Sequence, residues 1–127
     1  MPKVVLDSSA ILAVLNDEPG ASVVEQMLDE ALASTVNIAE VVTKLVERGR
    51  SLDHARRALQ AIGIEVVDFT LLLAERTGAM RSESKVRGLS LGDRACLALA
   101  EREGVPALTS DRNWVGAVSG IEVRLIR

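Results

Sequence analysis

Short apolar runs alternate with longer amphipathic segments along the whole of this 127-residue chain. The runs are rich in Val, Leu and Ile, and polar residues follow them at once, which is typical of buried strands. Between the runs, apolar residues recur every three or four positions, which predicts helices. This alternation predicts an α/β domain of three layers, with helices on both faces of a mainly parallel sheet of about four to five strands.

The expected strands cover residues 3–6, a weakly marked stretch near 31–35, and residues 64–69, 107–109 and 121–126. The expected helices cover residues 10–15, a segment from 22 to about 32, and residues 37–49, 51–62, 70 to about 85, and 91–103. Ser22 and Glu25 match the capping-box pattern, so Ser22 is expected to start its helix. A short turn or helix is expected around Trp114. Residues 1–127 are expected to form a single domain, since the chain is too short for two ordinary ones.

The composition limits the classes of partner. A net charge of −3 and a pI near 5.2 exclude a generally basic nucleic-acid binder, and an aromatic content of 2% argues against base stacking. Phosphate contacts would need a local basic cluster, although each candidate is also a plausible solvated residue. The candidates are Arg48, Arg50, Arg56, Arg57, Arg76, Arg81, Lys85 and Arg87. The single Cys96 cannot form an intrachain disulfide, and no membrane span is expected, so the expected location is the cytoplasm.

Four acidic residues lie near the places where strands or loops lead into helices. They are Asp7, Glu40, Asp93 and Asp111. The carboxyl ends of parallel strands bring separated segments together in open α/β sheets, so these side chains are expected to meet. Close carboxylates repel one another unless a proton or a cation relieves the repulsion, and hard cations such as Mg²⁺ bind all-oxygen ligand sets. The sequence therefore predicts a cation site.

Each acid also has a purely structural explanation. Asp7 and Asp111 could be helix N-caps, and the segments 37–40 and 90–93 both match the capping-box pattern. The joint pattern favours a site because small or hydroxyl residues flank all four acids. Ser9, Asn37 and Thr109 are the flanking residues expected to support and orient the carboxylates.

Four segments carry a resemblance to a known family. They are Val5-Leu6-Asp7-Ser8-Ser9-Ala10, Asn37-Ile38-Ala39-Glu40-Val41, Leu91-Gly92-Asp93-Arg94-Ala95-Cys96-Leu97-Ala98 and Leu108-Thr109-Ser110-Asp111-Arg112-Asn113-Trp114. In order and spacing they resemble the acidic motifs of PIN domains, most closely those of the small VapC toxins of toxin–antitoxin pairs. The resemblance implies an endoribonuclease that depends on Mg²⁺ or Mn²⁺, with the four acids as catalytic and metal-binding residues. It also implies an RNA substrate, a VapB-like antitoxin and a homodimer.

Two other functions are compatible with the pattern. One is a PIN-like RNA-binding scaffold without catalysis, which the presence of all four acids disfavours. The other is an Asp-based phosphotransfer protein with Asp7 as the acceptor. Phosphatases of the haloacid-dehalogenase type, which use an Asp in this way, usually carry a second Asp two residues later, where this chain has Ser9. An antitoxin would need an apolar docking surface, for which the helix faces with Val23 and Met27, or with Val41 and Leu45, are candidates, although core packing is their commoner use.

Overall fold

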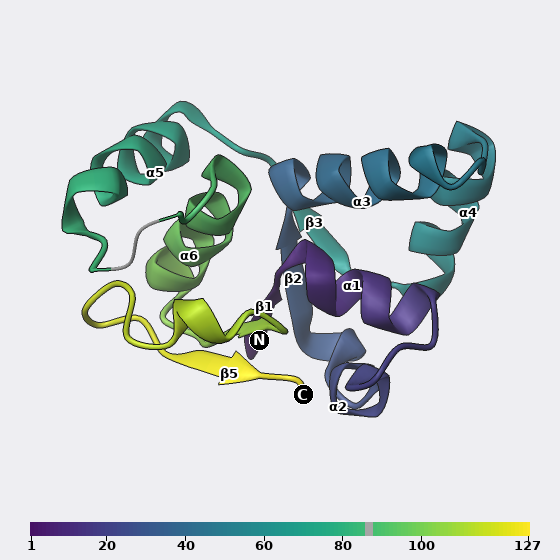
Figure 1. Cartoon of the computed structure of the whole chain (residues 1–127), viewed down its shortest axis with the longest axis horizontal. Coiled ribbons are helices and arrows are strands. Elements are labelled where there is room, and N and C mark those ends of the chain that lie inside the picture. Colours follow the sequence, from purple (N-terminus) through teal and green to yellow (C-terminus); the bar gives the residue numbers. More distant parts are fainter. Residues whose placement is uncertain (86–87) are drawn as a thin grey trace.

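The computed structural model describes residues 1–85 and 88–127, and the sheet at its centre is entirely parallel among them (Figure 1). Its strands follow the order β3-β2-β1-β4-β5. They are β1 (Val4–Leu6), β2 (Ala31–Ser34), β3 (Glu65–Val67), β4 (Ala107–Thr109) and β5 (Val123–Leu125). All five predicted strands are present, although four of them run over fewer residues than predicted. Strand β1 lies in the middle, and the chain continues to β2 on one side of it and returns to β4 on the other.

Six helices connect the described strands, together with two short 3₁₀ turns, one before β2 and one after β4. The helices are α1 (Ser8–Leu15), α2 (Ala21–Glu25), α3 (Thr35–Glu47), α4 (Leu52–Ile62), α5 (Leu71–Glu83) and α6 (Leu91–Glu103). The 3₁₀ turns are η1 (Leu28–Glu30) and η2 (Arg112–Trp114), and the second is the short helix expected around Trp114. None of the described helices is long and apolar enough to cross a membrane.

Both faces of the sheet are covered, because alternate residues of each strand enter different cores. Val4 and Leu6 of β1 pack with α1 to α4, whereas Val5 packs with α5 and α6. Figure 1 shows the same division, with α1 to α4 grouped on one side of the strands and α5 and α6 on the other. The fully buried Trp114 belongs to the core that contains Val5 and residues of α5 and α6. The three-layer α/β architecture predicted from the alternation is therefore confirmed.

The predicted start of the second helix was wrong. The N-cap of α2 is Gly20, not Ser22, and the helix ends at Glu25. Gly20 has a φ of 96°, and a Cβ there would lie 2.6 Å from the carbonyl oxygen of Ile126. Only glycine tolerates both this left-handed backbone and this close approach, so the chain turns into α2 two residues earlier than the capping pattern suggests. Val23 on this helix is 46% exposed and does not form part of a buried face.

Candidate active site

Asp7 is the buried centre of the site. It follows β1 directly, at the carboxyl end of the strand in the middle of the sheet, and it is only 5% exposed. Its Oδ2 atom accepts hydrogen bonds from the hydroxyls of Ser9 at 2.7 Å and Thr109 at 2.9 Å. The backbone N–H of Ser110 donates to the Ser9 hydroxyl, and the backbone N–H of Asp111 donates to the Thr109 hydroxyl. Ser9 and Thr109 thus orient the Asp7 carboxylate, in the place predicted for them.

Glu40 reaches the site from the middle of α3. The amide nitrogen of Asn37, one turn earlier and fully buried, donates to Glu40 Oε1 at 2.8 Å and to the backbone carbonyl of Gly92 at 3.1 Å. Asn37 therefore joins α3 to the first turn of α6. The sequence pattern that made Asn37 a helix cap was wrong, because the N-cap of α3 is Ser34, whose hydroxyl accepts from the N–H of Val36.

Asp93 and Asp111 both take part in helix caps at the site. Ser90 and Asp93 form the predicted capping box of α6, in which the Ser90 N–H donates to Asp93 Oδ2 at 2.9 Å and the Asp93 N–H donates to Ser90 Oγ at 3.1 Å. Asp111 is the N-cap of η2 and accepts from the N–H of Asn113 at 2.9 Å. The cap interpretation of these acids is correct, and it does not remove them from the site.

Burial and the charges of neighbouring carboxylates raise the pKa values of Asp7 and Asp93. Burial raises the pKa of Asp7 to about 6, the hydroxyls of Ser9 and Thr109 oppose this rise, and the charges of Asp93 and Glu40 add to it. Burial also raises the pKa of Asp93, to which the charge of Asp111 contributes. The structure therefore brings together all four acids singled out in the sequence, from β1, α3, α6 and the loop after β4.

Comparisons with known proteins identify the family of this chain. Residues 4–117 match the family model of the PIN domain. The chain belongs to the PIN-domain family. A ribonuclease VapC from Mycolicibacterium smegmatis is 34% identical over 116 residues, which cover 82% of this chain and 88% of the relative. This likeness places the chain among the VapC-like members of the family.

Solved structures of related toxins share the fold. The chain in the DNA-bound VapBC complex from Salmonella typhimurium aligns over all of both chains with a TM-score of 0.75 and 19% identity. VapC20 of Mycobacterium tuberculosis, described as a toxin that cleaves the sarcin–ricin loop, aligns with a TM-score of 0.75 and 21% identity over 96% of this chain and 99% of its own. At these identities the likeness demonstrates the common architecture.

The acidic set of this PIN domain has the donor chemistry of a hard-cation site. It offers only carboxylate oxygens, and none of the ion pairs among residues 1–85 and 88–127 involves any of the four acids. In the same part of the chain, no three acidic, His or Cys side chains are already arranged to ligate one ion. One oxygen each of Asp93 and Asp111 accepts a hydrogen bond from a backbone N–H. The donor types fit Mg²⁺ or Mn²⁺, and the ligand roles stay a prediction.

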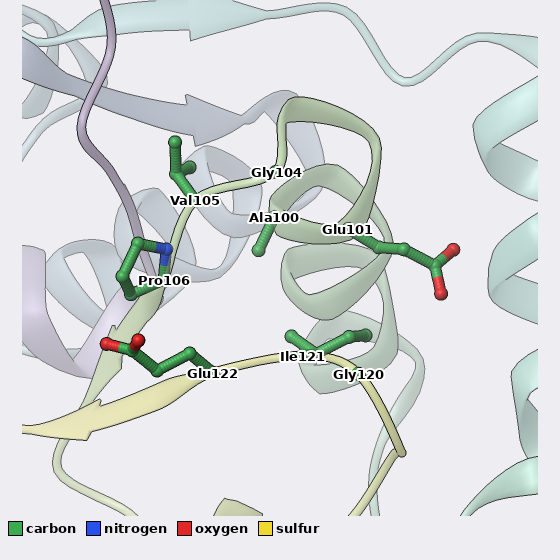
Figure 2. A pocket seen from close by; sticks show the side chains of 8 residues that line it. All are labelled: Ala100, Glu101, Gly104, Val105, Pro106, Gly120, Ile121 and Glu122. Carbon is green, nitrogen blue, oxygen red and sulfur yellow. The ribbon is translucent and has the colours of Figure 1, made fainter.

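Two hollows lie at opposite ends of the sheet of the PIN domain. A groove of about 440 Å³ adjoins Glu40, between α3 and the start of α6, and is lined by Ser8, Val36, Ala39, Glu40, Thr43, Lys44, Leu91 and Gly92. A smaller hollow of about 150 Å³ lies where α6 ends and β4 and β5 begin (Figure 2). Its acids, Glu101 and Glu122, extend in different directions in Figure 2, and each forms an ion pair with an arginine. The groove beside Glu40 is therefore the one that belongs to the candidate site.

Sequence reasoning missed one charged residue beside the acids. Arg94 follows Asp93 and is only 9% exposed, and its Nη1 donates to the backbone carbonyl of Thr77 at 2.9 Å. Its charge partly offsets the rise in the pKa of Asp93. The available signal was an arginine within the apolar Ala- and Leu-rich run of α6, where a charged side chain is unusual. Of the basic residues proposed for phosphate contact, Arg76 is held by Glu83 and Glu101, and Arg87 lies outside the described residues.

Proposed function

We propose that this PIN domain is a metal-dependent endoribonuclease that hydrolyses RNA phosphodiester bonds in the cytoplasm as the toxin of a toxin–antitoxin pair. The observation that carries the proposal is the buried Asp7 carboxylate, which has no cationic partner among the described residues and lies within electrostatic reach of Glu40 and Asp93. Uncompensated acids with perturbed pKa values in one place are typical of functional sites. The likeness to a ribonuclease VapC supplies the reaction class.

The chain's own groups prepare the site for this reaction. Asp7, Glu40, Asp93 and Asp111 would hold Mg²⁺ or Mn²⁺. When bound, such an ion polarises phosphoryl oxygens and lowers the pKa of water. Side chains hold Asp7 Oδ2 and Glu40 Oε1, and backbone N–H groups hold one oxygen each of Asp93 and Asp111, so each acid is kept in place without a bound group. A positioned carboxylate can also accept a proton from an attacking water, which needs no covalent bond between RNA and protein.

A VapB-like antitoxin is proposed as the partner, since VapBC complexes are among the structures with this fold. A basic side chain of the antitoxin near the four acids would neutralise their charge. Val41 and Leu45 lie in the core and cannot form a docking surface, whereas Val23 is exposed and stays a candidate. Homodimerisation is proposed on the same family basis.

RNA cleavage by the purified protein tests the activity. Cleavage of structured and unstructured RNA is expected with Mg²⁺ or Mn²⁺, and EDTA should abolish it. Asp7→Asn keeps the size of the side chain but removes the charge, so cleavage should fall by roughly 100-fold or more, while the melting temperature in EDTA should be no lower than that of the wild type. Cleavage that persists in EDTA, or at wild-type rate in Asp7→Asn, would contradict the proposal.

Growth of the expressing cell tests the role as a toxin. The wild-type chain alone should arrest growth, Asp7→Asn should be tolerated at equal expression, and co-expression with a VapB-like antitoxin encoded beside it should restore growth. A wild-type chain that is harmless at high expression and copurifies with no small protein would exclude the toxin role, leaving a nuclease with another function or a scaffold.

A further inference from the structure

Gly92 occupies the point of α6 that faces the carboxylate of Glu40. It is buried in the first turn of the helix, between the capping residues Ser90 and Asp93. A Cβ built on Gly92 would lie 2.5 Å from Glu40 Cδ and 2.6 Å from Glu40 Oε1, which is closer than a Cβ approaches atoms to which it is not bonded. The Glu40 carboxylate therefore occupies the space that any other residue at position 92 would fill.

The backbone conformation of Gly92 does not explain the glycine. Its φ is not in the left-handed region, unlike that of Gly20, and an α-helix interior ordinarily favours alanine over glycine. Gly78, in α5, provides a direct comparison, because a Cβ there would meet nothing within 4 Å. The requirement at position 92 is steric, and the group that imposes it is the acid of α3.

Asn37 keeps the carboxylate in this space. Its amide donates to both Glu40 and the Gly92 carbonyl, so a carboxylate pushed away by a side chain at position 92 would lose its 2.8 Å bond to a fully buried amide. The position also places a negative charge against the first turn of a 13-residue helix, where the helix dipole favours an anion. Steric space, a buried donor and the dipole all favour the same location of Glu40.

We propose that Gly92 is a positioning residue for Glu40, and that its missing side chain is what lets the α3 carboxylate join the site against the start of α6. The packing part of this inference stands on the geometry alone. Its catalytic part rests on the proposed ribonuclease function.

A double-mutant cycle in melting temperature tests the packing. Gly78→Ala should raise the melting temperature by roughly 2 to 4 °C in both the wild type and a Glu40→Ala background, because it only replaces an exposed helical glycine. Gly92→Ala should produce such a rise in the Glu40→Ala background only, since in the wild type it displaces the carboxylate from Asn37. Equal shifts for Gly92→Ala in the two backgrounds would overturn the proposal.

Cleavage kinetics test the catalytic part. Gly92→Ala should lower kcat by roughly 100-fold, and the Gly92→Ala/Glu40→Ala pair should be no slower than Glu40→Ala alone, because both changes remove the same carboxylate from the site. Gly78→Ala should retain wild-type kcat. Full activity in Gly92→Ala would overturn the positioning role. A wild type that cleaves no RNA would refute the proposed function, while the melting cycle would still decide the packing.

Discussion

Acidic residues gather at both ends of the sheet, and their surroundings differ. At the carboxyl end, burial raises the pKa of Asp7 to about 6, and neighbouring carboxylates add to the rise. At the amino end, Glu101 bonds to Arg76 through two atom pairs, at 2.6 and 2.8 Å, and these hydrogen bonds lower its pKa. At the carboxyl end none of the four acids forms an ion pair among the described residues, although Arg94 partly offsets the charge on Asp93, whereas at the amino end Glu101 and Glu122 are each paired with an arginine.

The difference separates a site from a structural ion pair. Folding brings the acids of the carboxyl end together although their repulsion and desolvation destabilise the folded state. The arginine-paired acids of the amino end need no further ligand. Uncompensated charge, more than the number of acids or the presence of a hollow, distinguishes the end that would bind a cation.

Replacing Asp7 by Asn should reverse the destabilisation at the carboxyl end. The pKa rise from 3.8 to about 6 corresponds to about 3 kcal/mol lost at neutral pH in the metal-free protein. In EDTA at pH 7.5, Asp7→Asn should therefore be more stable than the wild type by up to about 3 kcal/mol, less whatever the changed hydrogen bonds cost. Urea unfolding measures the difference.

The pH dependence has a definite sign. The folded protein holds the Asp7 proton more tightly than the unfolded chain, so this contribution stabilises the protein fully below pH 3.8 and is lost as the pH rises through about 6. The stability advantage of Asp7→Asn over the wild type should therefore shrink as the pH falls from about 6 to 3.8. A variant less stable than the wild type at pH 7.5, or an advantage that does not change with pH, would contradict this account of Asp7.

Divalent cations should stabilise the carboxyl end in proportion to their binding. At about 100 times the dissociation constant, Mg²⁺ or Mn²⁺ should add about 2.7 kcal/mol to the free energy of unfolding. The effect should be absent in Asp7→Asn/Asp93→Asn and retained in Glu101→Gln, which alters the other end. An equal shift in the double variant would place the binding elsewhere on the molecule.

Removing the acid at the amino end should have the smallest effect. Arg76 and Glu101 are each about one-third exposed, and pairs of this kind contribute about 1 kcal/mol or less, so Glu101→Gln should cost no more than that. The stability contributed by Glu101 changes with pH in the opposite direction to that of Asp7. Because the pKa of Glu101 is lowered, this contribution is present at pH values above the ordinary pKa of a glutamate and disappears as the pH falls. A loss above 2 kcal/mol, or impaired RNA cleavage, would show that the two ends are not independent.

The sequence predicted the order of the elements, because the apolar periods of strands and helices are local properties of the chain. It also predicted the capping box at Ser90 and Asp93, in which both partners lie within one turn. It failed at Gly20, where contact with the distant Ile126 decides where α2 begins, and at Asn37, whose second partner is the carbonyl of Gly92 in another helix. Contacts between segments far apart in the chain leave no local pattern.

The Thr109–Asp7 hydrogen bond links residues that are 102 positions apart. A chain emerging from the ribosome presents Asp7 almost at once, but Thr109 and Asp111 follow only after β1 to β3 and all six helices have been synthesised. During that interval the catalytic centre proposed here is incomplete. For most of the time in which each molecule is translated, it therefore does no harm to the cell. An antitoxin is needed only when the last strands fold.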